Sequence, residues 1–372
     1  MHCKKKFFWT GLFFLVLLVV FFLGPTQPSP QLKDTFRPLK ANITTIGQYI
    51  HSREEQLPVK SGNESKFFWA DEGKLVQTDY CLLYLHGFSA SPFEGSPTDL
   101  DFARHFHMNA YIPRLACHGL KSANPMLHFS GDTLWQSARE ALQIARLMGK
   151  KIIIMSTSTG GTLSLLLAAR YPKMVDGLIL LSPNIKIKNP ASFILAWPWG
   201  LQIARLLFHG KFRIIKDDSL HISSRYWYNK YRLESTVALQ KLLNASMKKT
   251  TFEKVKQPVF MGYYYKDEQH NDPTVSVPAL LKMYDQLGTL PARKQKQAFN
   301  AGVHVIGCGA FSKCQPEVEK ACIDFGNKIL KLKTGLAPNV SAKKQKTTGK
   351  EKFPRPAAFK NTLKVIKQAS LR

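Results

Sequence analysis

The chain has 372 residues, of which 44% are hydrophobic and 21% are charged, and its 53 Lys and Arg against 25 Asp and Glu give a net charge of +28. This apolar content argues against wholesale disorder, and 23 Gly and 21 Pro without a period argue against a fibrous protein. Six cysteines are too few for a disulfide scaffold of this length. The length allows one large α/β domain with insertions, or two smaller domains.

The N-terminal segment, residues 1–24, contains an uncharged apolar run over residues 7–23, preceded by Lys4, Lys5 and Lys6. Seventeen residues are the lower limit for a helix that spans a bilayer, and they exceed the apolar region of a typical signal peptide. Pro25 disfavours signal cleavage, so we predict an uncleaved N-terminal transmembrane helix, with secretion after cleavage as the alternative. The positive-inside rule then places the rest of the chain outside the cytoplasm. Residues 25–65 are expected to be a linker.

Past this linker, short apolar runs alternate with helical patterns, as is typical of a mostly parallel sheet covered on both faces. In chain order the patterns predict strand 81–85, helix 97–107, strand 110–115, helix 133–148, strand 151–155, helix 160–169, strand 177–181, strand 258–265, helix 276–287 and helix 315–332. We expect these elements to form one α/β core in two parts, residues 66–184 and 251–335.

The segment between the two parts, residues 185–250, breaks the alternation. It is longer than a loop should be and is rich in Trp, Tyr, Phe and Leu. The pattern predicts an inserted helical cap, which would shape a pocket and exclude water. A segment that only packs against the core is the alternative.

Much of the positive charge lies near the C-terminus. Residues 331–372 contain 12 Lys and Arg and one acid, Glu351, so this segment carries +11 of the +28. The remaining excess is spread along the chain, without zinc-knuckle spacing or the aromatic signature of an RNA-recognition module, so no nucleic-acid partner is expected. Residues 336–372 are interpreted as a basic tail, and a tail that binds anionic polymers is an alternative function.

A serine lies where the strongest strand meets the next helix, because residues 151–155 (KIIIM) continue into STSTGG. A nucleophilic serine on such a turn needs small residues two positions before and after it, since neighbouring backbones approach closely. Ser158 has Ser156 and Gly160 at these positions, whereas Ser156 itself follows the bulky Ile154. Ser158 is therefore the predicted nucleophile, and a simple helix cap is the alternative.

A His-Gly-Phe sequence follows the first buried strand, residues 81–85. Placed one strand-helix-strand unit before the serine turn, it lies where a second backbone donor for an oxyanion is needed. The backbone N–H groups of Phe88 and Thr159 are the predicted oxyanion-hole donors.

A nucleophilic serine needs a base, and the base needs an acid that orients it, in the chain order Ser, Asp, His. His304 lies after the last strand pattern and before the last helix, so it is the predicted base, with a structural loop histidine as the alternative. Asp267 has the usual distance from the preceding strand, while Asp272 has the usual distance to the next helix. We favour Asp272, with Asp267 as the alternative acid. Three other histidines are poorly placed for the role of base, namely His86, His118 and His270.

Residues 67–332 resemble the α/β-hydrolase superfamily, and within it carboxylesterase and monoacylglycerol-lipase-like serine hydrolases. The matching stretches are LYLHGFSASP, YIPRLACHGL, IIIMSTSTGGTLSLLLAARYP and AGVHVIG. The resemblance implies an α/β-hydrolase fold and a Ser-His-Asp triad that works through an acyl-enzyme, with no metal and no organic cofactor. The chain departs from the family pattern in the missing first glycine of the serine turn and in about five inserted residues before the acid.

The expected function is therefore hydrolysis of carboxylic esters by Ser158, His304 and Asp272. The aromatic insertion and the apolar N-terminus suggest acyl or lipid-like esters as substrates, reached from the membrane. A hydrolase-fold protein that binds a partner at the membrane without turnover is the alternative, because a fold alone never excludes it.

Overall fold

The computed structural model describes residues 2–215 and 220–335. The basic tail predicted over residues 336–372 lies outside the described part of the chain.

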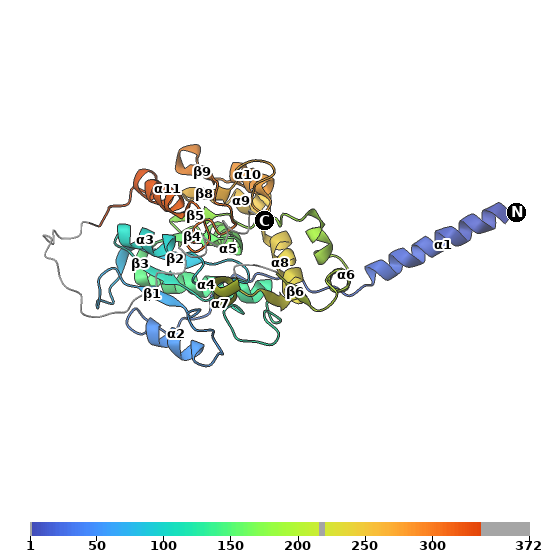
Figure 1. The fold of residues 1–372 in the computed structure, drawn as a ribbon, viewed down its shortest axis with the longest axis horizontal. Helices are drawn as coiled ribbons and strands as arrows, with labels where there is room; N and C mark the ends of the chain where they lie inside the picture. The colour runs from blue at the N-terminus through green and yellow to red at the C-terminus, as the bar shows by residue number, and fades with distance from the viewer. Residues whose placement is uncertain (1, 216–219, 336–372) are drawn as a thin grey trace, which may run out of the picture. The chain divides into compact units, whose positions relative to one another are not determined.

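A seven-stranded sheet with the order β1-β3-β2-β4-β5-β8-β9 forms the centre of the domain (Figure 1). Its strands are β1 (Lys66–Phe68), β2 (Thr78–Leu85), β3 (Asn109–Ile112), β4 (Gly149–Thr157), β5 (Gly177–Leu181), β8 (Val259–Tyr264) and β9 (Lys294–Phe299). Only β1 pairs antiparallel, with β3, and every other pair in this sheet is parallel. The carboxyl ends of the six parallel strands therefore meet at one edge of the sheet.

The sheet buries both of its faces, since neighbouring residues of a strand point to opposite sides. Ile152 and Ile154 of β4 pack with α4 (Gly131–Met148), α5 (Thr159–Arg170) and α10 (Val277–Gln286). Ile153 and Met155 pack on the other side with α3 (Thr98–His105) and α11 (Gln315–Lys328). This two-sided burial explains why β4 is apolar at four consecutive positions, residues 152–155.

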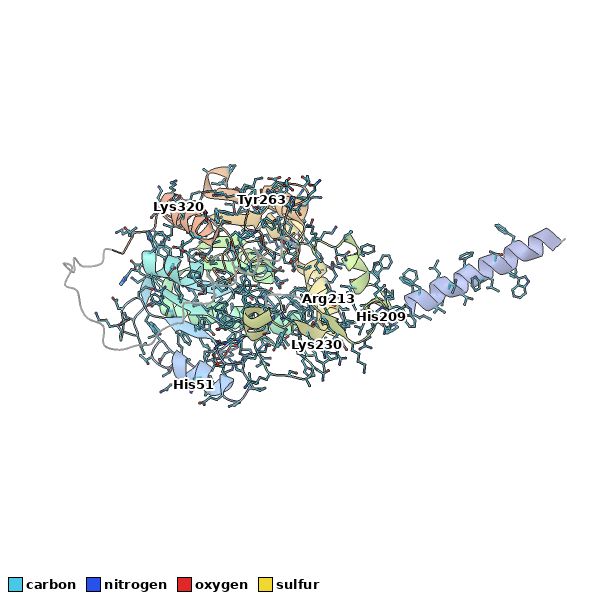
Figure 2. The ribbon with its side chains drawn as sticks, in the orientation of Figure 1. His51, His209, Arg213, Lys230, Tyr263 and Lys320 are labelled. Atoms are coloured by element: carbon cyan, nitrogen blue, oxygen red, sulfur yellow. The ribbon has the colours of Figure 1, made fainter. Side chains whose placement is uncertain are left out.

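The insertion, residues 185–250, contains more than helices. It holds η1 (Pro190–Ala196), α6 (Gly200–Leu207), β6 (Phe212–Ile214), α7 (Leu220–Tyr226), β7 (Lys230–Arg232), α8 (Leu233–Ser246) and the start of α9 (Lys249–Phe252). Strands β6 and β7 form a small antiparallel sheet that the sequence pattern does not predict. Figure 2 labels Arg213 of β6 and Lys230 of β7 in this part of the insertion.

The segment expected to be a linker, residues 25–65, packs on the domain instead. It contains α2 (Ile46–Glu54), whose Ile46 and Ile50 are buried in the core together with Leu32. Asp132 accepts hydrogen bonds from the backbone N–H groups of Gln31 and Leu32, 3.2 and 2.7 Å long. A few buried apolar residues thus hold residues 25–65 against the domain, although the proline content of this segment is typical of a linker that does not pack.

The N-terminal segment forms the helix α1 (His2–Phe22). Its end contacts the insertion, because the ring of Phe21 lies 5.9 Å from that of Trp197 and the indole of Trp199 donates to the carbonyl of Val20. Within residues 2–215 and 220–335, no helix has the length and apolarity needed to cross a membrane. The predicted transmembrane helix over residues 1–24 therefore has no support in the structure, and the location of the domain outside the cytoplasm stays a prediction.

Candidate active site

Ser158 lies on a sharp turn between β4 and α5. Its backbone has φ 55° and ψ −120°, a conformation that costs free energy for any residue other than glycine and that persists only where the surroundings impose it. The Ser158 N–H donates to the carbonyl of Leu181 on β5 over 3.1 Å, and its carbonyl accepts from the N–H of Asn184 over 2.8 Å. The side chain therefore stands at the carboxyl edge of the sheet, at the start of a helix.

Small residues after the serine make this turn possible. A Cβ atom on Gly160 would lie 1.9 Å from the carbonyl oxygen of Leu85, and one on Gly161 would lie 2.5 Å from the Cβ of Pro183. Ser156, the weaker candidate, is fully buried within β4, and its hydroxyl has no partner among the described residues. Burial inside the strand keeps Ser156 away from any substrate.

His304 and Asp272 come together at the same edge of the sheet. The Nδ1 atom of His304 lies 2.7 Å from Oδ2 and 3.0 Å from Oδ1 of Asp272. Asp272 is fully buried, and its Oδ1 also accepts from the N–H groups of Thr274 and Val275 over 2.8 and 3.0 Å. These bonds fix the orientation of the carboxylate, which in turn fixes the imidazole ring.

Asp267 occupies a different place. It is exposed and its carboxylate bonds to His270, with 2.8 Å between Oδ1 and the Nδ1 of that ring. A backbone bridge between Tyr265 and Asn271 closes the intervening residues into a turn, so the N–H of Asp272 bonds to the carbonyl of Tyr264 at the end of β8. The inserted residues loop out, and Asp272 follows the strand as if they were absent.

The two partners shift each other's pKa in opposite directions. Burial alone would raise the pKa of Asp272, but the charge of His304 and the hydrogen bonds from His304, Thr274 and Val275 outweigh it, so the pKa is lowered. Burial alone would lower the pKa of His304, but the charge and hydrogen bond of Asp272, helped by the charge of Glu94, raise it. The pair thus favours a carboxylate beside an imidazole that readily accepts a proton.

The other ring nitrogen of His304 is available. Its Nε2 atom is buried and has no hydrogen-bond partner within the described residues. A catalytic hydrogen bond from a serine to a base is often loose in the absence of substrate and tightens when substrate binds. The arrangement can therefore take a proton from a nucleophile at the carboxyl edge of the sheet.

The expected oxyanion donors flank Ser158. Thr159 is the first residue of α5, where a backbone N–H has no acceptor within its own helix. The loop that carries Phe88 packs on the serine, because a Cβ atom on Gly87 would lie 2.9 Å from the Cβ of Ser158. Thr159 thus directly follows the proposed nucleophile in sequence, and Phe88 directly follows the glycine that packs against it.

His86 and His118 are structural. The Nε2 of His86 accepts from the N–H of Leu115 over 3.1 Å, and its Nδ1 lies 2.9 Å from the carbonyl of Gly87. Burial, and to a smaller extent the neighbouring His118, holds the pKa of His86 well below its usual value. Burial also lowers the pKa of His118 to about 4. Both rings are neutral at neutral pH and support the loop that carries Phe88.

Sequence reasoning missed one residue of this site, Glu94. Its side chain is almost completely buried, and its Oε2 accepts from the N–H of Gly87 over 2.6 Å. Burial raises the pKa of this carboxyl to about 7, against hydrogen bonds that lower it. The available signal was a single acid within a run of small and apolar residues, HGFSASPFEGSP, where a surface loop would carry more polar side chains.

Comparison with known proteins gives the same fold. A sequence model of the serine aminopeptidase S33 family, a hydrolase family, matches residues 118–285, which include Ser158 and Asp272. A structure of metagenome-derived lipolytic enzymes has a TM-score of 0.55 at 16% identity, covering 72% of this chain and 98% of that one. The family match covers less than half of the chain and the lipolytic structure is only 16% identical, so these similarities show the hydrolase fold alone.

A second structure, the monoacylglycerol lipase of Paleococcus ferrophilus, has a TM-score of 0.52 with this chain at 13% identity and covers 70% of this chain and 96% of that one. No curated protein matches the sequence. Within residues 2–215 and 220–335, no three His, Cys, Asp or Glu side chains are grouped so as to hold a metal ion.

Proposed function

We propose that this chain is an α/β hydrolase that cleaves carboxylic esters through an acyl-enzyme formed on Ser158. The observation that carries the proposal is the buried pair of His304 and Asp272. The Nε2 atom of His304 has no partner within the described residues, and His304 lies at the same sheet edge as the strained serine turn. That combination provides a nucleophile, a base and a group that holds the base in one tautomer.

The reaction follows from these positions. The Oγ of Ser158 attacks the ester carbonyl carbon while Nε2 of His304 takes the hydroxyl proton, and the backbone N–H groups of Phe88 and Thr159 stabilise the oxyanion. The bond to the leaving alcohol then breaks, and His304 returns the proton to the alcohol oxygen. A water molecule, deprotonated by the same nitrogen, releases the acid and restores Ser158.

Aromatic side chains around the serine support apolar acyl groups as substrates. The ring of Phe88 lies 5.2 Å from that of Phe129 and 5.3 Å from that of Tyr231 in the insertion. On the other side of the loop, Phe93 stacks on Tyr226 at 4.0 Å. We propose that the insertion acts as a cap whose aromatic surface receives the acyl chain and excludes water from the oxyanion.

Labelling with a fluorophosphonate probe tests the nucleophile. We expect one labelled peptide that contains Ser158, and loss of the label in Ser158→Ala. Ser156→Ala is the matched control, because Ser156 is buried within β4, two residues before Ser158. This substitution should leave the labelling unchanged. A folded protein without label, or with label elsewhere, would contradict the proposal and favour a binding protein without turnover.

A panel of p-nitrophenyl esters with acyl chains of two to twelve carbons tests the substrate class. The aromatic surroundings predict that kcat/KM rises with chain length over the shorter esters, since each buried methylene contributes roughly 0.8 kcal/mol. A decline in kcat/KM from acetate onward would contradict an apolar acyl site, even if Ser158 proves to be the nucleophile.

A further inference from the structure

Glu94 lies in the loop between β2 and α3, within the site but outside the proposed triad. Only 2% of the residue is exposed. Buried carboxyl groups are rare unless a partner compensates them, and no Lys or Arg of the described residues is among the largest interactions on this one. Its position therefore calls for a functional explanation.

The carboxyl group shares Gly87 with the proposed nucleophile. Its Oε2 accepts from the Gly87 N–H over 2.6 Å. A Cβ atom on Gly87 would lie 2.9 Å from the Cβ of Ser158 and 3.0 Å from the Oε1 of Glu94. Gly87 directly precedes Phe88, so Glu94 holds the backbone that presents one of the two proposed oxyanion donors.

The same carboxyl group connects this loop to the insertion. The side chain of Trp227 is one of the polar groups that lower the pKa of Glu94. The indole ring also lies 5.4 Å from Phe311, in the loop that follows His304, and 6.3 Å from Phe93. The N–H of Tyr228 donates to the carbonyl of Ser89 over 2.9 Å. One buried acid thus bonds to the oxyanion loop and interacts with a side chain of the insertion that packs against this loop.

The charge of Glu94 also reaches the base, because it is one of the interactions that raise the pKa of His304. We propose that Glu94 is a positioning residue of the hydrolytic site, which holds Gly87 and Trp227 in place and favours the protonated His304 formed when Ser158 attacks. This inference rests on the ester-hydrolase function proposed above.

Few ionisable groups face this carboxyl. Tyr84 of β2 has its hydroxyl 3.5 Å away and donates it to Thr157 at the end of β4 over 2.9 Å. Among the largest interactions on Glu94 within the described residues, the cationic partner is His304. The charge of Glu94 in turn raises the pKa of Cys308 and of Tyr84. With a pKa of about 7, Glu94 is partly ionised at neutral pH, so its ionisation and the protonation of His304 are coupled.

Glu94→Gln tests the role of the charge, because an amide oxygen still accepts from Gly87. We expect kcat to fall roughly tenfold with little change in KM, and the acidic limb of the kcat/KM profile to move down by about one pH unit as the pKa of His304 falls. Asp99→Asn is the matched control, since this equally buried acid on α3 does not act on His304 and should leave the profile unchanged.

Trp227→Phe provides a second test if Glu94→Gln does not fold. It removes the indole N–H of Trp227 while an aromatic ring remains, so the pKa of Glu94 should rise and less of the carboxyl should be ionised. The acidic limb of the kcat/KM profile should then move to lower pH, by a smaller amount than in Glu94→Gln. Wild-type kcat and an unmoved acidic limb in either folded variant would overturn the inference. Absence of labelling at Ser158 in the unmutated protein would instead overturn the proposed function itself.

Discussion

The geometry of the candidate site depends on the backbone conformation at a few positions, as the residues Ser158, His304 and Asp272 show. The serine has a positive φ, which only its surroundings can enforce. The histidine and the aspartate lie 32 residues apart in sequence, yet two of their atoms are 2.7 Å apart. The sequence order and the strand-to-helix turn indicate the serine and the histidine as candidates. The closure of the turn at Tyr265 and Asn271, which brings Asp272 rather than Asp267 to His304, cannot be read from residue types.

Asp272→Asn should lower kcat by about 10³- to 10⁴-fold, because an amide stabilises the wrong tautomer of His304 and leaves the imidazolium without a counter-charge. Steady-state kinetics on a p-nitrophenyl ester measures this loss. Asp267→Asn serves as the control, because Asp267 is exposed and bonded to His270. Equal rates for the two variants would rule out the assignment of Asp272.

The acidic limb of kcat/KM should have its midpoint above pH 6.5. His304 must be unprotonated to accept the serine proton, so activity is present above its pKa and is lost as the pH falls through it. Asp272 raises that pKa from 6.5, against the effect of burial. A pH profile between 5 and 9 measures the midpoint, and a value clearly below 6.5 would contradict the ion pair.

At the scale of elements, the parallel strands and most of the helices that cover them are predictable, since strands buried on both faces are apolar along their length. The strand pattern of residues 177–181 matches β5 residue for residue. The edge strand β9, with the sequence KQKQAF, escapes prediction because five of its six residues are not buried. The short strands β1, β6 and β7 have three residues each, too few to show an alternation.

Gly160→Ala should disrupt the contact between β2 and the start of α5. The added Cβ would lie 1.9 Å from a backbone oxygen that cannot move without breaking the strand, so we expect a loss of roughly 1–3 kcal/mol in the free energy of unfolding and loss of probe labelling. Gly47→Ala on α2 has nothing within 4 Å and should change stability by about 1 kcal/mol at most. Urea unfolding compares the two, and an unaffected Gly160→Ala variant would contradict the tight turn.

At the scale of the whole molecule, charged groups buried at the site make stability depend on pH. Burial raises the pKa of Glu94 from 4.5 to about 7, so between these values the folded protein keeps a proton that the unfolded chain has lost. Stability therefore falls as the pH rises through this window. Sequence alone does not give the size of this penalty, because it depends on how completely the folded loop buries the carboxyl group.

Glu94→Gln should accordingly be more stable than the unmutated protein at pH 8, by up to about 3 kcal/mol, and equal to it near pH 4. Greater stability together with lower kcat would separate a functional role from a structural one. Urea unfolding at the two pH values makes the comparison. A variant that is less stable at pH 8 would show that the carboxylate stabilises the fold.

The central claim is that catalysis passes through an ester bond to Ser158. Rapid mixing with a slowly deacylated p-nitrophenyl ester, followed by acid quench and mass spectrometry of peptides, tests it most directly. We predict a burst of one equivalent of p-nitrophenol and an acyl adduct on the peptide that contains Ser158, both absent in Ser158→Ala. Steady turnover without a burst, or an adduct on another residue, would contradict the account.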